Sequence, residues 1–374
     1  MRAAPITLAT VGPKGVDLLA FFYKARRGWR ALTGRASYMK QERSLFYKTI
    51  WGEAATALGA TVLDFGGSLL EIRAGSGSLR VAENYTSLDD PVTLRIAGNK
   101  PLVHRLLREQ GLPVPTHCVC GFADFRSASE FIGGMDGSFV VKPARHTGAG
   151  DGVTAGIRGT KGLARAMALA GAYCDQVVIE KQVEGDNYRL LYLDGELLDA
   201  VLRWPPGVTG DGSSNLRRLI AKENRRRRDQ GFEASQSLID IDWELKQTVK
   251  RQGLRLRSVL HAGERIKLKS VVSDNCRDEN EGVMERVCRS VVRSGSMAAT
   301  AIGVRLAGVD IVTPDPLVPL EESGGAIIEV NTTPGLYYHY MTRTNSTPVA
   351  NAILKRVIPA AQSRPLPADM DYTL

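Results

Sequence analysis

The chain has 374 residues, of which 43% are hydrophobic and 24% are charged, so it can bury a sizeable core and is expected to form two or three domains. No run of about 18 apolar residues occurs, which argues against a transmembrane helix. The formal net charge of +9 suits nucleic acid as well as nucleotides and other small anions, so charge alone does not separate these ligand classes.

The start of the chain and its cysteines bear on the location of the protein. Residues 6–11 are mildly apolar but lack the charged region and cleavage site of a signal peptide, so they are expected to form a first strand. The five cysteines include no Cys-x-x-Cys pair, and their odd number argues against a disulfide framework. Cys118 and Cys120 would share one side of a strand, where buried thiols are favoured over a metal site. A cytoplasmic location is expected by default.

Turn signals predict three parts in chain order. Residues 1–92 are expected to form an N-terminal α/β domain, and Asp90-Pro91 marks its end. Residues 93–184 form the expected central lobe, and residues 185–374 form the C-terminal lobe. The first two parts are predicted to contain strands at 61–65, 69–73, 137–142 and 176–179, and helices at about 100–110 and 161–172.

The C-terminal lobe carries the clearest strand pattern. Asp194-Gly195 separates two strand-like runs, 190–193 and 196–202, and this dipeptide favours a two-residue hairpin turn. Two further strands are predicted at 308–312 and 326–331. Together with the helices of the first two parts, these strands predict an α/β protein built from α+β lobes.

A glycine-rich loop follows the predicted strand that ends at Lys142. Glycines at positions 148, 150 and 152 let the backbone approach a ligand closely, and successive backbone N–H groups can hold phosphate oxygens. Lys142 would add a positive charge beside them. The loop is neither a P-loop nor a dinucleotide fingerprint, because Gly-Lys-Ser/Thr is missing and the glycine spacing differs. A plain flexible turn remains the alternative.

Oxygen-bearing side chains recur in two apolar strands late in the chain. Glu329 and Asn331 are two residues apart, so both should point to one face of their strand, while Ile328 and Val330 point to the other face and the core. Asp310 lies likewise in an apolar strand. Hard oxygen ligands suit Mg²⁺, which binds one or two carboxylates together with substrate phosphates. An ordinary polar surface strand is the alternative.

Two weaker signals remain open. The apolar strand that runs into residues 180–183 could present its backbone to an adenine edge, or it could be an ordinary connector. The arginine run from 225 to 228 is expected to be a solvated loop or helix face, with contact to an anionic substrate or nucleic acid as the alternative.

In order and spacing, these stretches resemble the ATP-grasp module of cyanophycin synthetases, which is shared more distantly with glutathione synthetases and D-alanine–D-alanine ligases. The resemblance covers about two-thirds of the chain, and its last block is the most specific. The matching stretches are Gly111-Leu-Pro-Val-Pro115, Val140-Val-Lys-Pro143, Val178-Ile-Glu180, Gly185-Asp-Asn-Tyr-Arg-Leu-Leu191, Gly210-Asp-Gly212, Ala307-Gly-Val-Asp310, Gly324-Gly-Ala-Ile-Ile-Glu-Val-Asn331, Pro334-Gly-Leu336 and His339.

The resemblance implies an ATP-grasp fold in which ATP lies between two α+β lobes, behind an N-terminal pre-ATP-grasp α/β domain. It implies a ligase for amino acids or small peptides that uses ATP and Mg²⁺, with Mn²⁺ as a substitute, and dimers are common among such relatives. Asp310, Glu329 and Asn331 would bind the metal. The residues implied for ATP are Lys100 and Lys142 at the phosphates, Thr147, Gly148, Gly150 and Gly152 in the loop over them, Glu180, Lys181 and Val183 in the adenine hinge, and Asn187 near the ribose.

The chain also departs from that family. Its glycine loop is one residue longer, and Asn187 stands where relatives usually carry a carboxylate. Lys269 stands where cyanophycin synthetases have an arginine that is followed later by Ser-Thr-Gly-Gly. The Mur-ligase-like second module of cyanophycin synthetases is missing from the sequence, so another amino-acid or peptide ligase is expected in place of cyanophycin synthesis.

The implied reaction is carboxylate activation by ATP followed by attack of an amine. Lys142 would offset charge on the transferred phosphoryl group, and Lys269 and Arg203 are the candidates for stabilising the later oxyanion. Arg189 could bind a substrate carboxylate or serve as a structural ion-pair partner. An ATP-grasp kinase, a partner protein that binds ATP without catalysis, and a basic nucleic-acid-binding protein are the rivals. The last leaves the oxygen donors unexplained and shows no aromatic stacking motif, so nucleic acid is not the expected partner.

Overall fold

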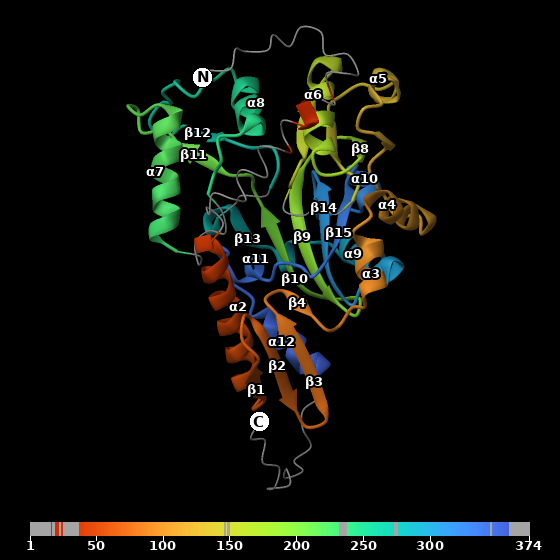
Figure 1. Ribbon diagram of the computed structural model, residues 1–374, viewed down its shortest axis with the longest axis vertical. Coiled ribbons are helices and arrows are strands. Elements are labelled where there is room, and N and C mark those ends of the chain that lie inside the picture. Colours follow the sequence, from red (N-terminus) through yellow and green to blue (C-terminus); the bar gives the residue numbers. More distant parts are fainter. Residues whose placement is uncertain are drawn as a thin grey trace.

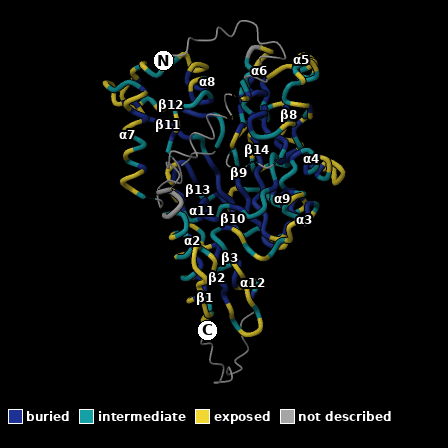
Figure 2. Tube along the Cα trace, in the orientation of Figure 1, coloured by how far each residue is buried: buried dark blue, intermediate teal, exposed yellow. Residues whose placement is uncertain are grey.

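The computed structural model describes residues 16, 19–21, 24, 37–145, 147, 150–231, 238–272, 276–344 and 346–358, without the side chains of 37–41 and 161. The strand expected at 6–11 lies outside these residues. Figure 1 shows three groups of elements around a central sheet, and Figure 2 shows many buried residues along its strands. Within the described residues, no helix is both long enough and apolar enough to cross a membrane.

An antiparallel four-stranded sheet forms the narrow end of the molecule (Figure 1). Leu79 and Val81 alternate with more exposed residues along their strand and point into a core with Trp51 and Ile353, because side chains alternate across a strand. The last described helix, α12, therefore packs against the N-terminal domain. The elements are α2 Ser37–Ala57, β1 Thr61–Asp64, β2 Leu69–Ala74, β3 Gly77–Ala82, β4 Tyr85–Thr86 and α12 Val349–Val357.

A second four-stranded sheet, in the order β5-β8-β6-β7, forms the central lobe. Phe139, Val141 and Ile179 pack from its strands against Met167 of a covering helix. The predicted strand before the glycine loop and the predicted helix after it are confirmed. The elements are β5 His117–Gly121, α5 Phe125–Gly133, β6 Phe139–Pro143, β7 Thr154–Ile157, α6 Thr160–Gly171 and β8 Gln176–Lys181.

The central sheet has five antiparallel strands in the order β13-β10-β9-β14-β15. The predicted hairpin is confirmed, since Asp194 and Gly195 have φ values of 51° and 79°, as a two-residue turn with two left-handed positions requires. Helices α3, α4 and α9 cover one face of the sheet. The elements are α3 Pro91–Ala97, α4 Lys100–Glu109, β9 Asp186–Leu193, β10 Glu196–Arg203, β13 Asn280–Gly282, α9 Arg289–Ile302, β14 Leu306–Thr313 and β15 Ala326–Thr332.

The described residues between β10 and β13, which are 204–231, 238–272 and 276–279, form an insertion that lies beside the central lobe at the upper left of Figure 1. Leu219, Ile220, Leu245 and Leu268 give its described residues a small core of their own. Its elements are β11 Gly207–Thr209, α7 Leu216–Asp229, α8 Trp243–Arg251, β12 Arg265–Lys267 and the 3-10 turn η1 Arg277–Glu279. The remaining short helices are η2 Met284–Arg286, α10 Leu320–Ser323 and α11 Tyr337–Tyr340.

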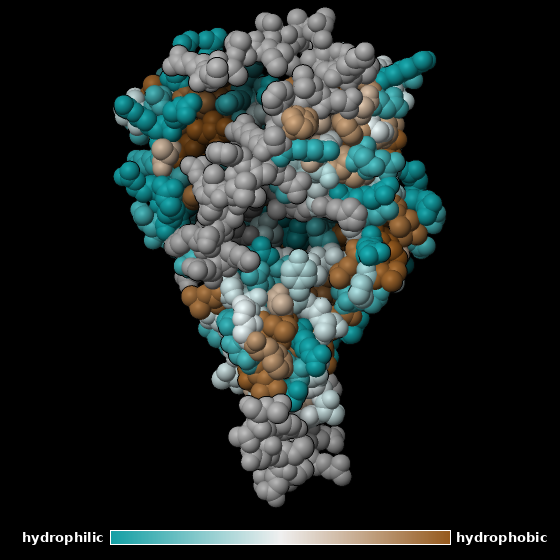
Figure 3. All heavy atoms as spheres, in the orientation of Figure 1, coloured by the Kyte–Doolittle hydropathy of each residue, from teal (hydrophilic) through white to brown (hydrophobic). Residues whose placement is uncertain are grey.

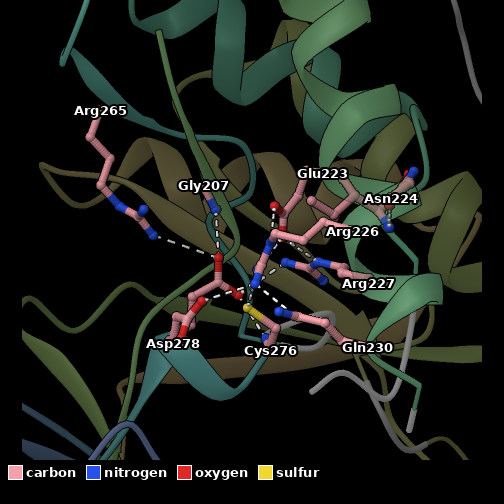
Figure 4. A network of polar contacts seen from close by, with 11 residues as sticks. Gly207, Glu223, Asn224, Arg226, Arg227, Gln230, Arg265, Cys276 and Asp278 are labelled. Atoms are coloured by element: carbon pink, nitrogen blue, oxygen red, sulfur yellow. Dashed lines mark hydrogen bonds and ion pairs between the residues drawn. The ribbon is translucent and has the colours of Figure 1, made fainter. Parts of the chain in front are cut away.

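The expectation of a solvated arginine run is wrong for Arg227, whereas Arg226 keeps 37% of its side chain exposed. Arg227 is 2% exposed, and its Nε and Nη2 atoms lie 2.8 Å from a carboxylate oxygen of Glu223 and 3.2 Å from one of Glu279. Arg226 also pairs with Glu223, at 2.8 Å. Figure 4 shows both arginines pointing into this network, which also reaches the backbone N–H of Gly207 at 2.9 Å. The network connects α7 to η1 and β11 through ion pairs and a hydrogen bond.

Candidate active site

A cleft of about 930 Å³ lies between the central lobe, the central sheet and the insertion. Figure 3 shows hydrophilic side chains around a recess near the middle of this face. Gly152 is not among the lining residues, and Gly148 lies outside the described residues. The other predicted site residues all line the cleft: Lys100, Lys142, Thr147, Gly150, Glu180, Lys181, Val183, Asn187, Arg203, Lys269, Asp310, Glu329 and Asn331.

Asp310 and Glu329 face each other across neighbouring strands. The two residues are register partners in the β14–β15 pair, and the Asn331 Nδ2 donates to Asp310 Oδ2 at 3.2 Å. The predicted convergence of these three side chains is therefore present in the structure. The register shifts between Asp310 and Ile311, and this irregularity corrects one expectation: Ile328 lines the cleft, while Ile327 takes its place in the core.

Two arginines surround the carboxylate of Asp310. Arg189 Nε and Nη2 donate to its two oxygens at 2.6 and 2.9 Å, and Arg203 Nη2 donates to Oδ1 at 2.8 Å. Burial by itself would raise the pKa of Asp310, but the two guanidinium groups outweigh burial and hold that pKa below its ordinary value. With the Asn331 amide, four donors occupy this carboxylate, which is its ordinary capacity. A metal bound by Asp310 would have to replace one of them.

The close approach of Arg189 depends on a glycine in the neighbouring strand. A Cβ at Gly308 would lie 2.8 Å from the Cβ of Pro334 and 3.0 Å from Arg189 Nη1. A larger residue there would push the guanidinium away from Asp310. The Gly-Val-Asp stretch of β14 thus supplies the carboxylate of Asp310 and, at Gly308, the space that Arg189 needs to reach it.

Lys100 and Lys142 approach the cleft from two different elements. Lys100 Nζ lies 3.2 Å from Glu329 Oε1 and 3.3 Å from the carbonyl oxygen of Thr147. Lys142 Nζ lies 2.6 Å from Glu180 Oε1, and both side chains are at most 5% exposed. Glu180, predicted as the first residue of an adenine hinge, thus turns its side chain to a buried ion pair with Lys142.

The glycine loop contributes two described glycines with different surroundings. Gly150 and Gly152 have φ values of 76° and 73°, which favour glycine. A Cβ at Gly152 would lie 2.8 Å from Pro143 and 2.9 Å from Tyr173, so this glycine serves packing at the base of the loop. Gly150 and Thr147 line the cleft.

The two predicted catalytic residues are both buried. Arg203 is 4% exposed, and its Nε and Nη2 donate to Asn187 Oδ1 at 3.0 and 2.6 Å. The Asn187 oxygen expected near a ribose is therefore already occupied by Arg203. Lys269 is 6% exposed and lies 3.2 Å from Asp242 Oδ2, so it is no solvated surface lysine. Its neighbour Ser270 donates its backbone N–H to Glu244 at 2.7 Å.

Sequence reasoning missed the aromatic side of the site. Tyr337 and Tyr338 of α11 line the cleft, and the ring centroid of Tyr338 lies 4.9 Å from Arg203 Cζ and 5.5 Å from Arg189 Cζ. Such contacts hold guanidinium groups in place through the ring quadrupole. The only sequence signal was the position of these tyrosines just after the Pro334-Gly-Leu336 stretch. Arg43 and Asn84 of the N-terminal domain also line the cleft, and no sequence pattern pointed to either residue.

The residues at Asp310 fit a divalent ion by their chemistry. Two carboxylates and one amide offer hard oxygen donors, and Glu329 keeps 28% of its side chain exposed at the cleft. Within the part of the chain that the structure describes, no three His, Cys, Asp or Glu side chains gather in a metal-type cluster. Cys118 and Cys120 form no disulfide bond in the structure.

His104 is buried, and its Nε2 lies 3.5 Å from Oε1 of Glu180, the ion-pair partner of Lys142. Burial lowers the pKa of His104 to about 4, although Glu180 acts in the opposite direction. Its Nε2 lies 3.3 Å from the carbonyl oxygen of Ile328, and no hydrogen bond to Nδ1 exists among the described residues. The folded state therefore holds the neutral imidazole.

We expect the free energy of unfolding to fall as the pH falls from 6.5, the ordinary pKa of histidine, towards 4. The neutral imidazole contributes its full stability above this window, and the loss at its lower end amounts to about 3 kcal/mol from this residue. Urea unfolding across the window measures the effect. In His104→Gln the slope with pH should be flatter, whereas the exposed His261→Gln should keep it; equal slopes in all three proteins would contradict the assignment.

The chain is similar in sequence to known biosynthetic enzymes. No protein-family model matches the chain. A cyanophycin synthetase from Geminocystis herdmanii is 29% identical over 286 residues, which cover 73% of this chain and 31% of that protein. The glutathione biosynthesis bifunctional protein of Streptococcus mutans is 28% identical over 293 residues, which cover 75% of this chain and 38% of that protein. The chain thus spans about a third of the length of the curated relatives it matches.

The fold has a solved counterpart. The crystal structure of a bifunctional glutathione synthetase from Pasteurella multocida matches with a TM-score of 0.54 and 22% identity, over 84% of this chain and 45% of that chain. The mixed helices and sheets of the chain form an α+β ATP-grasp fold. By sequence the chain resembles ATP-grasp ligases, with cyanophycin synthetases among its relatives.

Proposed function

We propose that the protein is an ATP-dependent carboxylate–amine ligase that joins amino acids or small peptides through an acyl-phosphate and releases ADP and phosphate. The observation that carries the proposal is the meeting of Lys100 and Lys142 with the oxygen donors Glu329 and Asn331 in one cleft. The names of the relatives describe a synthetase of cyanophycin and a protein of glutathione biosynthesis, which supports amide formation.

Lys100 and Lys142 would hold the phosphates of ATP, with the described part of the glycine loop above them. Lys181 and Val183 would border the adenine, where the half-buried Ile328 offers an apolar surface. Asp310, Glu329 and Asn331 would hold Mg²⁺ or Mn²⁺. When bound, the ion would neutralise phosphate oxygens and make the terminal phosphorus more electrophilic.

In the first step, a carboxylate oxygen of the acid forms a bond to the γ-phosphorus while the bond to the bridging oxygen of ADP breaks. In the second step, the amine attacks the acyl carbon, phosphate leaves and the amine nitrogen loses a proton. Arg203 and Lys269 would face the negative charge that develops on the acyl oxygen. Their burial excludes water, which matters because water hydrolyses an acyl-phosphate.

The test is an ADP-release screen with paired amino acids, followed by mass spectrometry of the products. ADP release that requires both an acid and an amine, with one new amide per ADP, is the expected result. Hydroxylamine in place of the amine should trap the activated acid as a hydroxamate. A stable phosphorylated product formed without any amine would contradict ligation and identify a kinase. If the protein slowed the migration of nucleic acid in a gel in a salt-sensitive way and did not turn over ATP, that result would contradict both the ligase and the kinase.

A further inference from the structure

The positive charge of the chain is concentrated in the insertion. Its described residues, 204–231, 238–272 and 276–279, hold sixteen Lys and Arg side chains against nine Asp and Glu side chains, so most of the net charge of +9 lies here. The arginine run at 225–228 contributes on both sides of α7. Arg226 and Arg227 point into the network of Figure 4, whereas Arg225 and Arg228 are exposed.

A row of exposed cations covers the outer face of α7, at the left edge of Figures 1 and 3. The basic row consists of Arg217, Arg218, Lys222, Arg225 and Arg228. At 3.6 residues per turn these side chains lie opposite the buried Leu219, Ile220 and Arg227. Within the part of the chain that the structure describes, no side chain of the basic row makes an ion pair or a hydrogen bond.

The basic row does not stabilise its own helix. Like charges three and four residues apart on a helix repel each other, as at positions 218, 222 and 225. Arg217 and Arg218 also lie in the first turn, where the helix dipole disfavours cations, and this turn contains no acidic residue. An anionic partner would offset both effects. The basic row is therefore better explained by a partner than by the fold.

The cationic surface continues from α7 to the edge of the cleft. The exposed Arg255 lies in the segment after α8, and this segment pairs with the start of α7, because the Arg217 N–H donates to the Leu256 carbonyl oxygen at 3.0 Å. The end of α8 contacts β12, where Gln252 Nε2 donates to the carbonyl oxygen of Lys267 at 2.8 Å. Lys267 is exposed and lines the cleft. A chain bound along the basic row can therefore reach the cleft over cations.

The surroundings of these cations favour an acidic peptide over nucleic acid. Proteins that hold single strands place aromatic rings among their cations, because bases stack on the rings. The described part of the insertion has no Phe or Tyr, and an arginine already lies on each of its two tryptophan rings. Arg343 lies 4.4 Å from the centroid of Trp204, and Arg165 lies 4.9 Å from that of Trp243. The surface also leads to the proposed ligation site, where carboxylates and amines react.

We propose that the basic row holds an acidic peptide, a run of aspartate or glutamate residues, whose reacting group enters the cleft. This inference rests on the proposed function and names the class of one substrate. The row is about 16 Å long, since a helix rises 1.5 Å per residue between positions 217 and 228. An extended peptide covers that length with about five residues. Affinity should therefore rise with peptide length up to about five or six acidic residues and then level off.

The first test measures the Kd of hexaglutamate amide with an N-terminal fluorophore by fluorescence anisotropy. The variant combines Arg218→Gln, Lys222→Gln and Arg225→Gln. Its Kd should be about tenfold or more above that of the wild type, because three exposed charge contacts are lost, and added salt should weaken the wild-type complex. The variant should fold as well as the wild type, with an equal or higher Tm, since it loses repulsion and no contact.

The matched control combines Arg95→Gln, Arg289→Gln and Arg293→Gln, three exposed arginines of α3 and α9 outside the cleft. It removes the same charge and should keep the wild-type Kd. An unchanged Kd in the α7 variant would overturn the proposal, and so would an equal loss in the control. A DNA heptamer carries six phosphates; if it bound as tightly as the peptide, as single strand or duplex, and weakened in the α7 variant, the surface would be one for nucleic acid.

The second test offers unlabelled hexaglutamate and hexaaspartate in the ADP-release screen, each paired with single amino acids. At least one peptide should be ligated. The α7 variant should raise its KM about as much as the Kd and leave kcat unchanged, because the reacting groups lie in the cleft. Ligation of free amino acids without use of either peptide would overturn the proposal. If no substrate pair releases ADP, the proposed function fails, while the binding comparison still decides whether the basic row holds an acidic peptide.

Discussion

Glu329→Gln should reduce ADP release at least about a hundredfold while leaving the fold intact. The substitution keeps the shape of the side chain but removes the negative charge that a divalent ion would need at the cleft. Glu329 keeps 28% of its side chain exposed and contacts Lys100 at 3.2 Å, so little of the core depends on it. Initial rates at saturating ATP and Mn²⁺ binding by the purified protein measure the effect.

The matched control for Glu329 is Glu321→Gln on α10, an exposed residue outside the cleft. It should leave both the rate and the Mn²⁺ affinity unchanged. Undiminished turnover in Glu329→Gln would refute the metal assignment. A loss of rate with full Mn²⁺ affinity would place Glu329 elsewhere in the reaction.

Arg227→Met should lower the free energy of unfolding by about 3–5 kcal/mol. Arg227 is 2% exposed and lies between the carboxylates of Glu223 and Glu279, so its removal leaves buried negative charge without a partner. Burial already raises the pKa of Glu279 despite the opposing effect of Arg227. Urea unfolding monitored by circular dichroism gives the change.

Two further variants make the Arg227 prediction specific. Arg228→Met removes the next arginine of the run, which is exposed, and should change the stability by no more than about 0.5 kcal/mol. Arg227→Met combined with Glu279→Gln should recover part of the loss, because the uncompensated charge is then smaller. Equal effects of Arg227→Met and Arg228→Met would show that the run is a solvated face after all.

The strands and the oxygen donors could be predicted because their signals are local. Asp194-Gly195 sets its hairpin through backbone sterics alone, and the two-residue spacing of Glu329 and Asn331 puts both side chains on one face. The same rule failed at Ile328, since an irregularity in a strand pair depends on the partner strand. The alternation of residues along a single strand contains no information about its partner strand.

The rest of the site depends on partners that lie far apart in the chain. Arg227 forms a buried ion pair with Glu279, and Arg203 donates hydrogen bonds to Asn187 and Asp310. A run of charges has the same composition whether it faces water or buried carboxylates. The sequence therefore favoured a solvated helix face for the arginines at 225–228. Tyr338 likewise becomes a site residue only because two arginines stack on its ring.

The most direct test of the account is the fate of an oxygen atom. An acid substrate found in the ADP-release screen is labelled with ¹⁸O in its carboxylate, and the released phosphate is analysed by mass spectrometry. Acyl-phosphate formation in this cleft predicts one labelled oxygen in each phosphate, because the attacking carboxylate oxygen stays on phosphorus when the amine enters. Phosphate without label, together with an amide product, would contradict the account.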